Sequence, residues 1–112
     1  MEEIALHTRI KPGCETGYDA AHASLAPRLN AAMAKAGVCN WRIWRSGREL
    51  FHLIEVDDYA RMRRQLAQDP HNLAWQEEIN QYLEVQDDYS GDDRGLGQVW
   101  DFATDYERSI DA

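Results

Sequence analysis

Two polar aromatic residues, Tyr18 and His22, stand four positions apart in a stretch whose apolar residues recur every three or four positions. Side chains at i and i+4 of a helix are neighbours, so both rings should lie on the apolar face that continues to Leu25 and Leu29. A neutral imidazole beside a phenol can accept and donate protons near neutral pH, as general acid–base catalysis requires. The alternative is an ordinary core pair, in which the histidine bonds a backbone carbonyl and the tyrosine hydroxyl reaches solvent.

Aromatic residues elsewhere in the chain are candidates to line a cavity in front of this helix. Trp41 and Trp75, with Phe51, would supply flat walls, and sugar rings present C–H faces that pack on aromatic rings. The competing interpretation is core packing, which we favour for Trp100, while Trp44 is equally suited to a subunit interface.

His7 and His52 occupy two stretches predicted to be neighbouring strands, which makes them candidates for a cross-strand pair. Glu55 lies in an otherwise apolar strand and must be paired, lie at a strand end or face a polar pocket. The sequence contains no HxH, HExxH or CxxC motif, so we expect no metal site. It also lacks GxGxxG, P-loop and GxSxG motifs, so a nucleotide cofactor is not supported.

The charge of the chain is unevenly distributed. Its 112 residues carry 12 Lys+Arg and 20 Asp+Glu, a formal net charge of −8, and residues 84–112 alone hold 9 acidic and 2 basic residues. The densest basic run, Arg61-Met62-Arg63-Arg64, is too short for the phosphate contacts of a nucleic-acid-binding protein. We therefore expect no nucleic-acid partner. The acidic segment should form a solvated rim and tail, apart from a pocket drawn from residues 18–75.

The sequence favours a cytoplasmic location. Its start, Met1-Glu2-Glu3, lacks the basic and apolar segments of a secretory signal, and no run approaches the roughly 20 apolar residues of a membrane span. Cys14 and Cys39 are 25 residues apart, which is typical of reduced thiols in a cytosolic protein. We expect neither a membrane partner nor a disulfide.

The elements that must position these residues follow from the hydrophobic periodicity. Alternation over residues 4–10 predicts a strand, and helical spacing over residues 14–36 predicts a helix that Pro27 kinks or splits. Gly37 should end this helix in the left-handed conformation. Two stretches rich in aromatic and β-branched residues then predict the strands of a hairpin, at residues 38–45 and 49–56.

The second half of the chain predicts two further helices and one strand. Asp57 or Asp58 should cap a helix over residues 59–68, and Asp69-Pro70 should open the next helix. The buried stripe of that helix is expected at Leu73, Ala74, Trp75, Glu78, Ile79, Tyr82 and Leu83. The remaining ranges are a surface loop at 87–95, a last strand at 96–102 and a tail without a pattern at 104–112.

This order of strands and helices predicts the ferredoxin-like α+β fold, an antiparallel four-stranded sheet with helices on one face. We expect a single domain over residues 1–104 and a C-terminal tail over residues 105–112. Both faces of the predicted sheet carry apolar residues, for example Trp41 and Ile43 on one face and Trp44 on the other. Two such sheets packed face to face around a two-fold axis would bury the second face, so we expect a homodimer.

Several short motifs follow one another along residues 4–102. They are Tyr18-Asp19-Ala20-Ala21-His22, Pro27 with Leu29, Gly37-Val38-Cys39-Asn40-Trp41-Arg42-Ile43, Leu50-Phe51-His52-Leu53-Ile54-Glu55, Asp69-Pro70 with Trp75, and Gln98-Val99-Trp100-Asp101-Phe102. In order and spacing this series resembles the L-rhamnose mutarotase family of small dimeric α+β barrel proteins. The resemblance implies interconversion of the α and β anomers of a 6-deoxyhexose, with no cofactor or metal.

The resemblance also implies roles for individual residues. His22 matches the active-site histidine of the family, and Tyr18 matches the tyrosine one helical turn before it, so the two are the expected catalytic residues. The substrate-binding residues that we expect are Trp41, Trp75, His52 and Glu55.

Three positions depart from the family pattern. Trp41 stands where rhamnose enzymes usually carry Tyr, Ala74-Trp75 replaces a tandem Trp pair, and Met62 replaces a Trp of the preceding helix. All three are expected to touch the sugar pocket. L-fucose is therefore a rival to L-rhamnose as the substrate.

Two other functions share this architecture, because a fold does not determine a function. A cofactor-independent or haem-linked monooxygenase would need a pocket for a large aromatic substrate or a haem-ligating histidine, and bound pigment would reveal it. A non-catalytic small-molecule-binding dimer would bind sugar saturably without accelerating anomer exchange.

Overall fold

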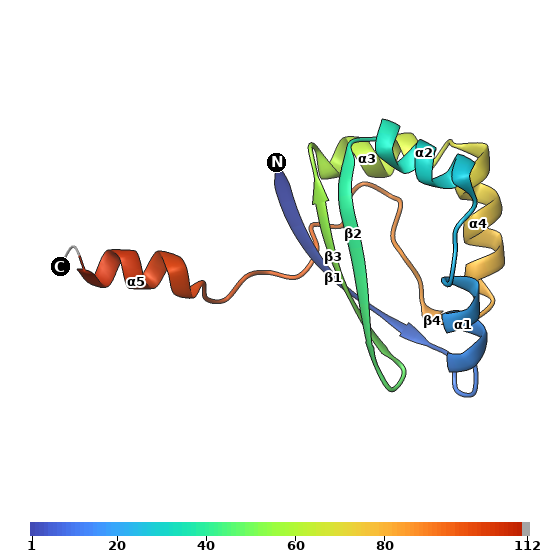
Figure 1. The fold of residues 1–112 in the computed structure, drawn as a ribbon, viewed down its shortest axis with the longest axis horizontal. Helices are drawn as coiled ribbons and strands as arrows, with labels where there is room; N and C mark the ends of the chain where they lie inside the picture. Colours follow the sequence, from blue (N-terminus) through green and yellow to red (C-terminus); the bar gives the residue numbers. More distant parts are fainter. Residues whose placement is uncertain (111–112) are drawn as a thin grey trace.

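The structure is a computed structural model that describes residues 1–110. Its elements are β1 (Glu2–Ile10), α1 (Glu15–Ala21), α2 (Pro27–Lys35), β2 (Val38–Ser46), β3 (Glu49–Val56), α3 (Tyr59–Leu66), α4 (Pro70–Asn80), β4 (Leu83–Val85) and α5 (Phe102–Ile110). Helices α1 to α4 cover one side of the sheet, and α5 projects away from the rest of the chain (Figure 1). The predicted α+β class, with helices on one face, is confirmed.

The strands form one antiparallel sheet in the ferredoxin-like order β2-β3-β1-β4. In this register His7 lies opposite Phe51, and Leu6 lies opposite His52. Side chains alternate between faces along a strand, so His7 and His52 lie on opposite faces of the sheet. The two histidines are therefore not the cross-strand pair that the sequence suggests.

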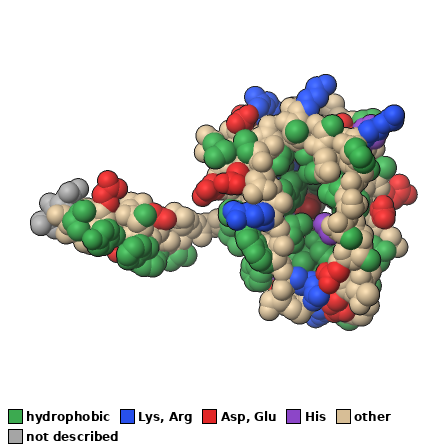
Figure 2. Space-filling view, viewed as in Figure 1, with side chains coloured by type: hydrophobic (Ala, Val, Ile, Leu, Met, Phe, Trp, Pro, Cys, Tyr) green, Lys and Arg blue, Asp and Glu red, His purple; other side chains and the backbone are tan. Residues whose placement is uncertain are grey.

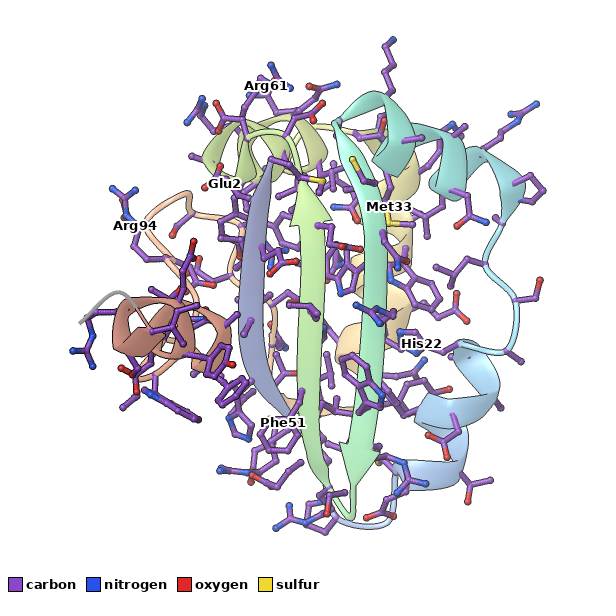
Figure 3. The ribbon with its side chains drawn as sticks, turned by 60° about the vertical axis from the view of Figure 1, so that its left-hand side comes forward. Glu2, His22, Met33, Phe51, Arg61 and Arg94 are labelled. Atoms are coloured by element: carbon purple, nitrogen blue, oxygen red, sulfur yellow. The ribbon has the colours of Figure 1, made fainter. Side chains whose placement is uncertain are left out.

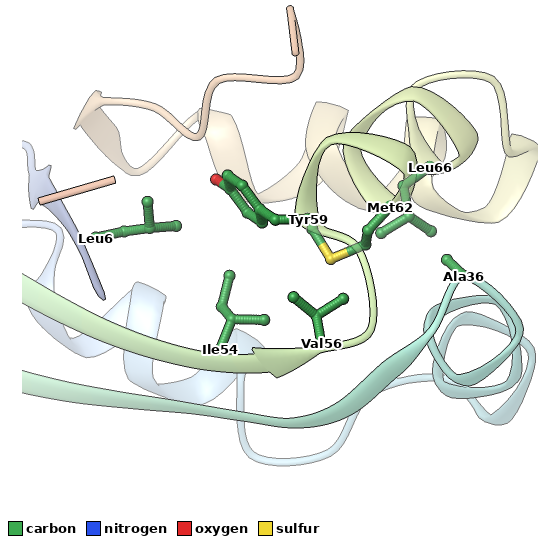
Figure 4. Close-up of a cluster of buried hydrophobic side chains, with 7 residues drawn as sticks. All are labelled: Leu6, Ala36, Ile54, Val56, Tyr59, Met62 and Leu66. Atoms are coloured by element: carbon green, nitrogen blue, oxygen red, sulfur yellow. The ribbon is translucent and has the colours of Figure 1, made fainter. Parts of the chain in front are cut away.

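The helices and the inner face of the sheet enclose the core. One buried cluster joins Leu6, Ile54 and Val56 of the sheet to residues of α3 (Figure 4). Met62 belongs to this cluster and is fully buried. It does not line the cavity described below, in contrast to its predicted place in the sugar pocket.

The helix boundaries agree with the local sequence signals. Pro27 splits the predicted long helix, since it begins α2 while the preceding Ala26 is extended, with ψ of 137°. Gly37 has a φ of +98°, as expected of a left-handed residue that ends a helix. The carboxylates of Asp58 and Asp69 cap α3 and α4 by accepting hydrogen bonds from backbone N–H groups.

The stripe predicted on α4 is confirmed at Ile79 and at Leu83, which are buried, but it is wrong at its start. Leu73 is 52% exposed, whereas Asn72 is buried beside Ile79. The error arises because the core receives a polar residue here, and hydrophobicity alone gives no reason to bury an asparagine. The buried amide is satisfied, since Asn72 Nδ2 donates to the Leu66 carbonyl oxygen at 2.9 Å.

The predicted last strand is also wrong, since residues 96–101 pair with no strand among residues 1–110. Leu83–Val85, directly after α4, occupies the edge beside β1 instead, because Lys11 N donates to the Tyr82 carbonyl at 2.8 Å and holds it there. The tail predicted without a pattern over residues 104–112 is instead helical as far as residue 110, in α5, which begins at Phe102. Residues 111–112 of that prediction lie outside the described residues. Among residues 1–110, no helix is long and apolar enough to span a membrane.

Candidate active site

A cavity of about 460 Å³ opens between the inner face of the sheet and helices α1, α2 and α4. Figure 2 shows this hollow among hydrophobic side chains. Its volume lies in the usual range for small-molecule sites, and a few polar groups interrupt an apolar wall, as in such sites. The titratable or aromatic side chains of the wall that matter most are Tyr18, His22, Trp41, His52, Trp75 and Asp87.

Tyr18 and His22 lie together at the end of α1, as the spacing predicts. Their ring centroids are 4.3 Å apart, and the His22 ring meets Trp75 of α4 edge-on at 5.1 Å. Figure 3 labels His22 beside the sheet. Because α1 ends at Ala21, His22 is its C-cap and can reach the last-turn carbonyl oxygen of Tyr18 with its ring Nδ1, at 3.2 Å.

This contact determines the tautomer of His22. A carbonyl oxygen can only accept a hydrogen bond, so Nδ1 carries the proton and Nε2 keeps a lone pair. Burial lowers the pKa of His22 below its ordinary value of 6.5, against opposing effects of the Tyr18 carbonyl and of Asp87 and Asp19. The imidazole is therefore neutral at pH 7.

Burial also raises the pKa of Tyr18, with smaller contributions from the negative charges of Asp87 and Asp19. The phenol therefore keeps its proton at neutral pH. The two neighbours thus offer different groups to a ligand, a basic nitrogen on His22 and a hydroxyl donor on Tyr18.

Trp41 is held by a hydrogen-bonded chain across the inner face of the sheet. Its indole Nε1–H donates to His52 Nδ1 at 3.1 Å, so the proton of His52 is on Nε2 and donates to Thr8 Oγ1 at 2.8 Å. Both ring nitrogens of His52 are thus occupied, and burial lowers its pKa. The indole N–H of Trp41 is used within the protein, so Trp41 presents its ring to the cavity.

A second polar group of the wall comes from α4 and the loop after β4. Gln76 Nε2 donates to the Tyr89 hydroxyl at 3.1 Å, and Asn72 Oδ1 accepts from both residues at 3.4 Å. Burial raises the pKa of Tyr89 to about 12, so its hydroxyl stays protonated. Three groups with both donor and acceptor capacity therefore lie side by side in the wall.

Of the six predicted catalytic and substrate-binding residues, the structure brings five together in the cavity wall and leaves one outside. Trp41, Trp75 and His52 line the cavity with the Tyr18–His22 pair. Glu55 does not line it, because it alternates with Ile54 and Val56 and so faces the opposite side of β3. Phe51 lies on that outer face as well, 44% exposed.

Several polar wall residues were missed by the sequence analysis. Asn72 and Gln76 are spaced i and i+4 on the face of α4 that bears Ile79, which is a signal that could have found them. Asp87 has no such signal. Its place in the wall corrects the expectation that the acidic segment lies apart from the pocket and that the pocket ends at residue 75.

Ala74, which we expected to touch the sugar pocket, is exposed and does not line the cavity. Gln76 lies beside Trp75 in the wall instead. Across residues 1–110, no three His, Cys, Asp or Glu side chains gather in a way that could hold a metal ion.

Both the sequence and the fold of the chain have counterparts among known proteins. A family model described as L-rhamnose mutarotase matches residues 3–102 of the sequence. No curated protein matches the sequence significantly.

Solved structures with a similar fold include an L-rhamnose mutarotase from Formosa agariphila, with a TM-score of 0.72 and 21% identity over 91% of this chain and 99% of that one. Tetracenomycin F2 cyclase from Streptomyces glaucescens, a type-II polyketide cyclase, has a TM-score of 0.56 and 21% identity over 94% and 89% of the two chains. An uncharacterised NIPSNAP domain protein from Burkholderia xenovorans has a TM-score of 0.53 and 22% identity over 77% and 88%. At these identities the structures establish a shared fold.

Proposed function

Because the chain belongs to the L-rhamnose mutarotase family, and is therefore an enzyme that interconverts sugar anomers, we propose that its cavity takes a 6-deoxyhexose, L-rhamnose or L-fucose. The observation that carries this proposal is the pairing of a basic imidazole nitrogen on His22 with a protonated phenol on Tyr18 in one cavity wall. Opening a cyclic sugar needs one group that removes a proton and one that supplies a proton.

In the proposed reaction, His22 Nε2 removes the proton of the anomeric hydroxyl. The O–H electron pair forms the C1=O bond, the C1–O5 bond breaks, and O5 takes the hydroxyl proton of Tyr18. After rotation about C1–C2, the reverse transfers close the ring on the other carbonyl face and return both protons. The sequence of steps is redox-neutral and restores both side chains.

The rest of the wall supports binding of such a sugar. Trp41 and Trp75 offer aromatic surfaces to the C–H faces of the ring. The polar group of Asn72, Gln76 and Tyr89 can exchange hydrogen bonds with ring hydroxyls. The apolar side chains that share the cavity, Leu25, Met33 and Ile79, suit a methyl group at C6 better than a hydroxymethyl group.

NMR saturation transfer between the two H1 signals of a sugar tests the proposal, because magnetisation passes between anomers only when they interconvert. We expect catalytic amounts of protein to accelerate exchange of L-rhamnose or L-fucose, and to accelerate L-mannose less, since it is L-rhamnose with a hydroxyl at C6. If neither 6-deoxy sugar exchanges faster, the substrate proposal fails. Saturable binding without faster exchange would favour the non-catalytic alternative.

A matched pair of variants tests the assignment of His22. His22→Ala should reduce exchange to the rate in buffer, because the base is lost. His71→Ala removes a histidine that is exposed in the first turn of α4, outside the cavity, and should exchange sugar like the parent. Equal exchange by both variants would contradict the proposed role of His22.

We further propose that the chain forms a homodimer. The outer face of the sheet exposes Trp44 and Phe51, and Figure 3 labels Phe51. The C-terminal arm, which we define as residues 96–110, exposes a second set of large apolar side chains. Two unpartnered apolar surfaces on one chain favour a second copy as the partner.

We also propose a cytoplasmic location. Cys14 and Cys39 are both free thiols in the structure, as is usual in a reducing compartment. Fractionation of cells that express the full chain tests this proposal, and recovery outside the cytoplasmic fraction would contradict it.

A further inference from the structure

Asp87 lies two residues after β4 and lines the cavity together with Tyr18, His22 and His52. Its side chain is only 12% exposed. A carboxylate is costly to hold at such a wall unless it is paired, so its environment must supply a compensating charge.

Arg63 of α3 supplies that charge from behind the wall. It is fully buried, its Nη2 donates to Asp87 Oδ1 at 3.3 Å, and its Nε donates to the Tyr59 hydroxyl at 2.9 Å. The guanidinium also lies 4.5 Å from the ring centre of Tyr89 and 5.4 Å from that of Trp41. The ring of Tyr59 lies 5.1 Å away, so three aromatic rings and one carboxylate fix the cation in place.

This arrangement does not satisfy Arg63 completely. Within residues 1–110, its Nη1 is buried and has no hydrogen-bond partner. Apolar residues that fill the same volume are often at least as stabilising as a buried ion pair, so an incompletely bonded buried arginine is not explained by stability alone. Its position is explained if the pair holds the carboxylate where a ligand meets it.

Asp87 has bonding capacity left for such a ligand. Only Oδ1 accepts a hydrogen bond from the described part of the chain, which leaves Oδ2 without a protein donor. Oδ2 is not fully buried, so it remains accessible. A sugar hydroxyl in the cavity can therefore donate to Oδ2.

We propose that Asp87 is a further active-site residue, which accepts a hydrogen bond from a sugar hydroxyl and stabilises His22 when His22 takes the anomeric proton, and that Arg63 is the positioning residue that holds its carboxylate. This inference rests on the proposed function. Proton transfer makes a cation of a half-buried imidazole, and a nearby negative charge offsets the loss of hydration. The same charge raises the pKa of Tyr18, which keeps the acid protonated before the reaction but opposes the loss of its proton, so the gain that we propose is at His22.

Three variants of the full chain separate this role from a purely structural one. Asp87→Asn keeps the size and the acceptor for Arg63 but removes the charge, and Asp87→Glu keeps the charge. Asp92→Asn removes an equal charge from an exposed position of the same loop, outside the cavity, and is the matched control. Each variant is compared in sugar exchange, in urea unfolding and in the pKa of His22, measured by NMR titration of its imidazole.

The titratable groups that face His22 are known from the structure. They are Tyr18 and Asp19 on α1, His52 on β3 and Asp87 on the loop. Asp19 is paired with Arg45 at 2.7 Å. We expect Asp87→Asn to lower both the pKa of His22 and kcat/KM for the accepted sugar, the latter roughly tenfold or more, since hydrogen bonds to charged groups contribute that much.

Asp92→Asn should leave both values unchanged, and Asp87→Glu should restore part of the His22 pKa. If the parent accelerates exchange and Asp87→Asn matches Asp92→Asn in kcat/KM, the Asp87 proposal is overturned while the proposed function stands. If activity falls only with the stability of the fold and the pKa of His22 does not move, the role is structural and the proposal is equally overturned. If the parent accelerates no sugar, the proposed function itself fails, whatever Asp87 does to His22.

Discussion

Tyr18 and His22 share one turn of α1, and burial shifts their proton affinities in opposite directions. Both shifts favour the neutral form of the group, which leaves a phenol with its proton and an imidazole without one. An acid and a base therefore coexist at the same pH. We therefore expect the enzyme to be active at neutral pH.

Tyr18→Phe should slow sugar exchange by about 10²-fold or more, because the acid is lost while the ring that packs against His22 remains. Its free energy of unfolding should change little.

The rate in the parent protein should rise with pH through the pKa of His22, which lies below 6.5, and stay level near pH 7, because protonated His22 cannot act as a base. Saturation transfer from pH 5 to 8 measures both effects, and an unchanged rate in Tyr18→Phe would refute its role as the acid.

His52 should make the stability of the protein depend on pH. Burial lowers its pKa in the folded chain below the ordinary 6.5, so the unfolded chain binds the proton more tightly. The contribution of neutral His52 to stability is therefore fully present above about pH 6.5, and it is lost as the pH falls toward the pKa of the folded chain. The urea midpoint should decrease from pH 7.5 to 5.5, and less so in His52→Gln. The urea midpoint of His71→Gln, which changes an exposed histidine, should decrease as much as that of the parent. An equal decrease in the parent and both variants would contradict this prediction.

At this scale the sequence predicts what one helical turn determines and misses what the tertiary fold assembles. The spacing of Tyr18 and His22 is enough to bring their rings together. Arg63 lies in a basic run that indicates a solvated surface, and its burial depends on how the loop after β4 packs against α3. The spacing of Tyr59, Met62, Arg63 and Leu66 does form one buried stripe of α3, which is the signal that could have revealed it.

Among the elements, the path of the loop after β4 depends on Gly95. This residue has a φ of +76°, and a Cβ there would lie 2.7 Å from the Ala5 carbonyl oxygen of β1. The same oxygen accepts a hydrogen bond from Leu96 N at 2.7 Å, so the backbone must approach β1 closely. The loop that carries Asp87 and Tyr89 is thereby anchored at its far end.

Gly95→Ala should lower the free energy of unfolding by about 1–3 kcal/mol, because both the left-handed conformation and the contact with β1 become strained. Gly97→Ala is the matched control, since a Cβ there meets no described atom within 4 Å, and its stability should stay within about 0.5 kcal/mol of the parent. Urea unfolding measures both variants. Equal stabilities of the two variants would show that the loop does not need this approach.

Some element boundaries are determined by neighbouring residues, and others depend on the tertiary fold. Pro27, Gly37 and Asp69 act on their own neighbours, so the split helix, its end and the start of α4 follow from the sequence. The strand expected at residues 96–102 needed a free sheet edge, which is not a property of those residues. Leu83–Val85, which directly follows α4, occupies the edge of β1, and the apolar residues of 96–102 are left uncovered.

The whole molecule is more extended than a compact domain of the same length. Its radius of gyration is 15.9 Å, against about 13 Å for a compact domain of this size, and its longest dimension is 52 Å. The arm of residues 96–110 accounts for the difference, as Figure 1 shows. Its apolar side chains include Val99, which is 99% exposed, and its helix carries Phe102, Tyr106 and Ile110 at i, i+4 and i+8 on one face.

These side chains and the outer face of the sheet are the two surfaces that a second copy would cover. In a two-fold dimer each surface occurs twice, so arms from both chains can pack on the partner and close the assembly. Apolar contact thus favours a second copy of the chain as the partner.

Paired substitutions in the full chain test this assembly by sedimentation equilibrium. The arm variant Phe102→Ser with Tyr106→Ser and the sheet variant Trp44→Ser with Phe51→Ser should each raise the dimer dissociation constant by about tenfold or more, since aromatic anchors dominate such interfaces. The core clusters contain none of these four residues, so both variants should still fold. Leu73→Ser makes a similar change at an exposed position of α4 and should remain dimeric with the parent. A monomeric parent, or arm and sheet variants that associate as tightly as Leu73→Ser, would show that these surfaces do not form the interface.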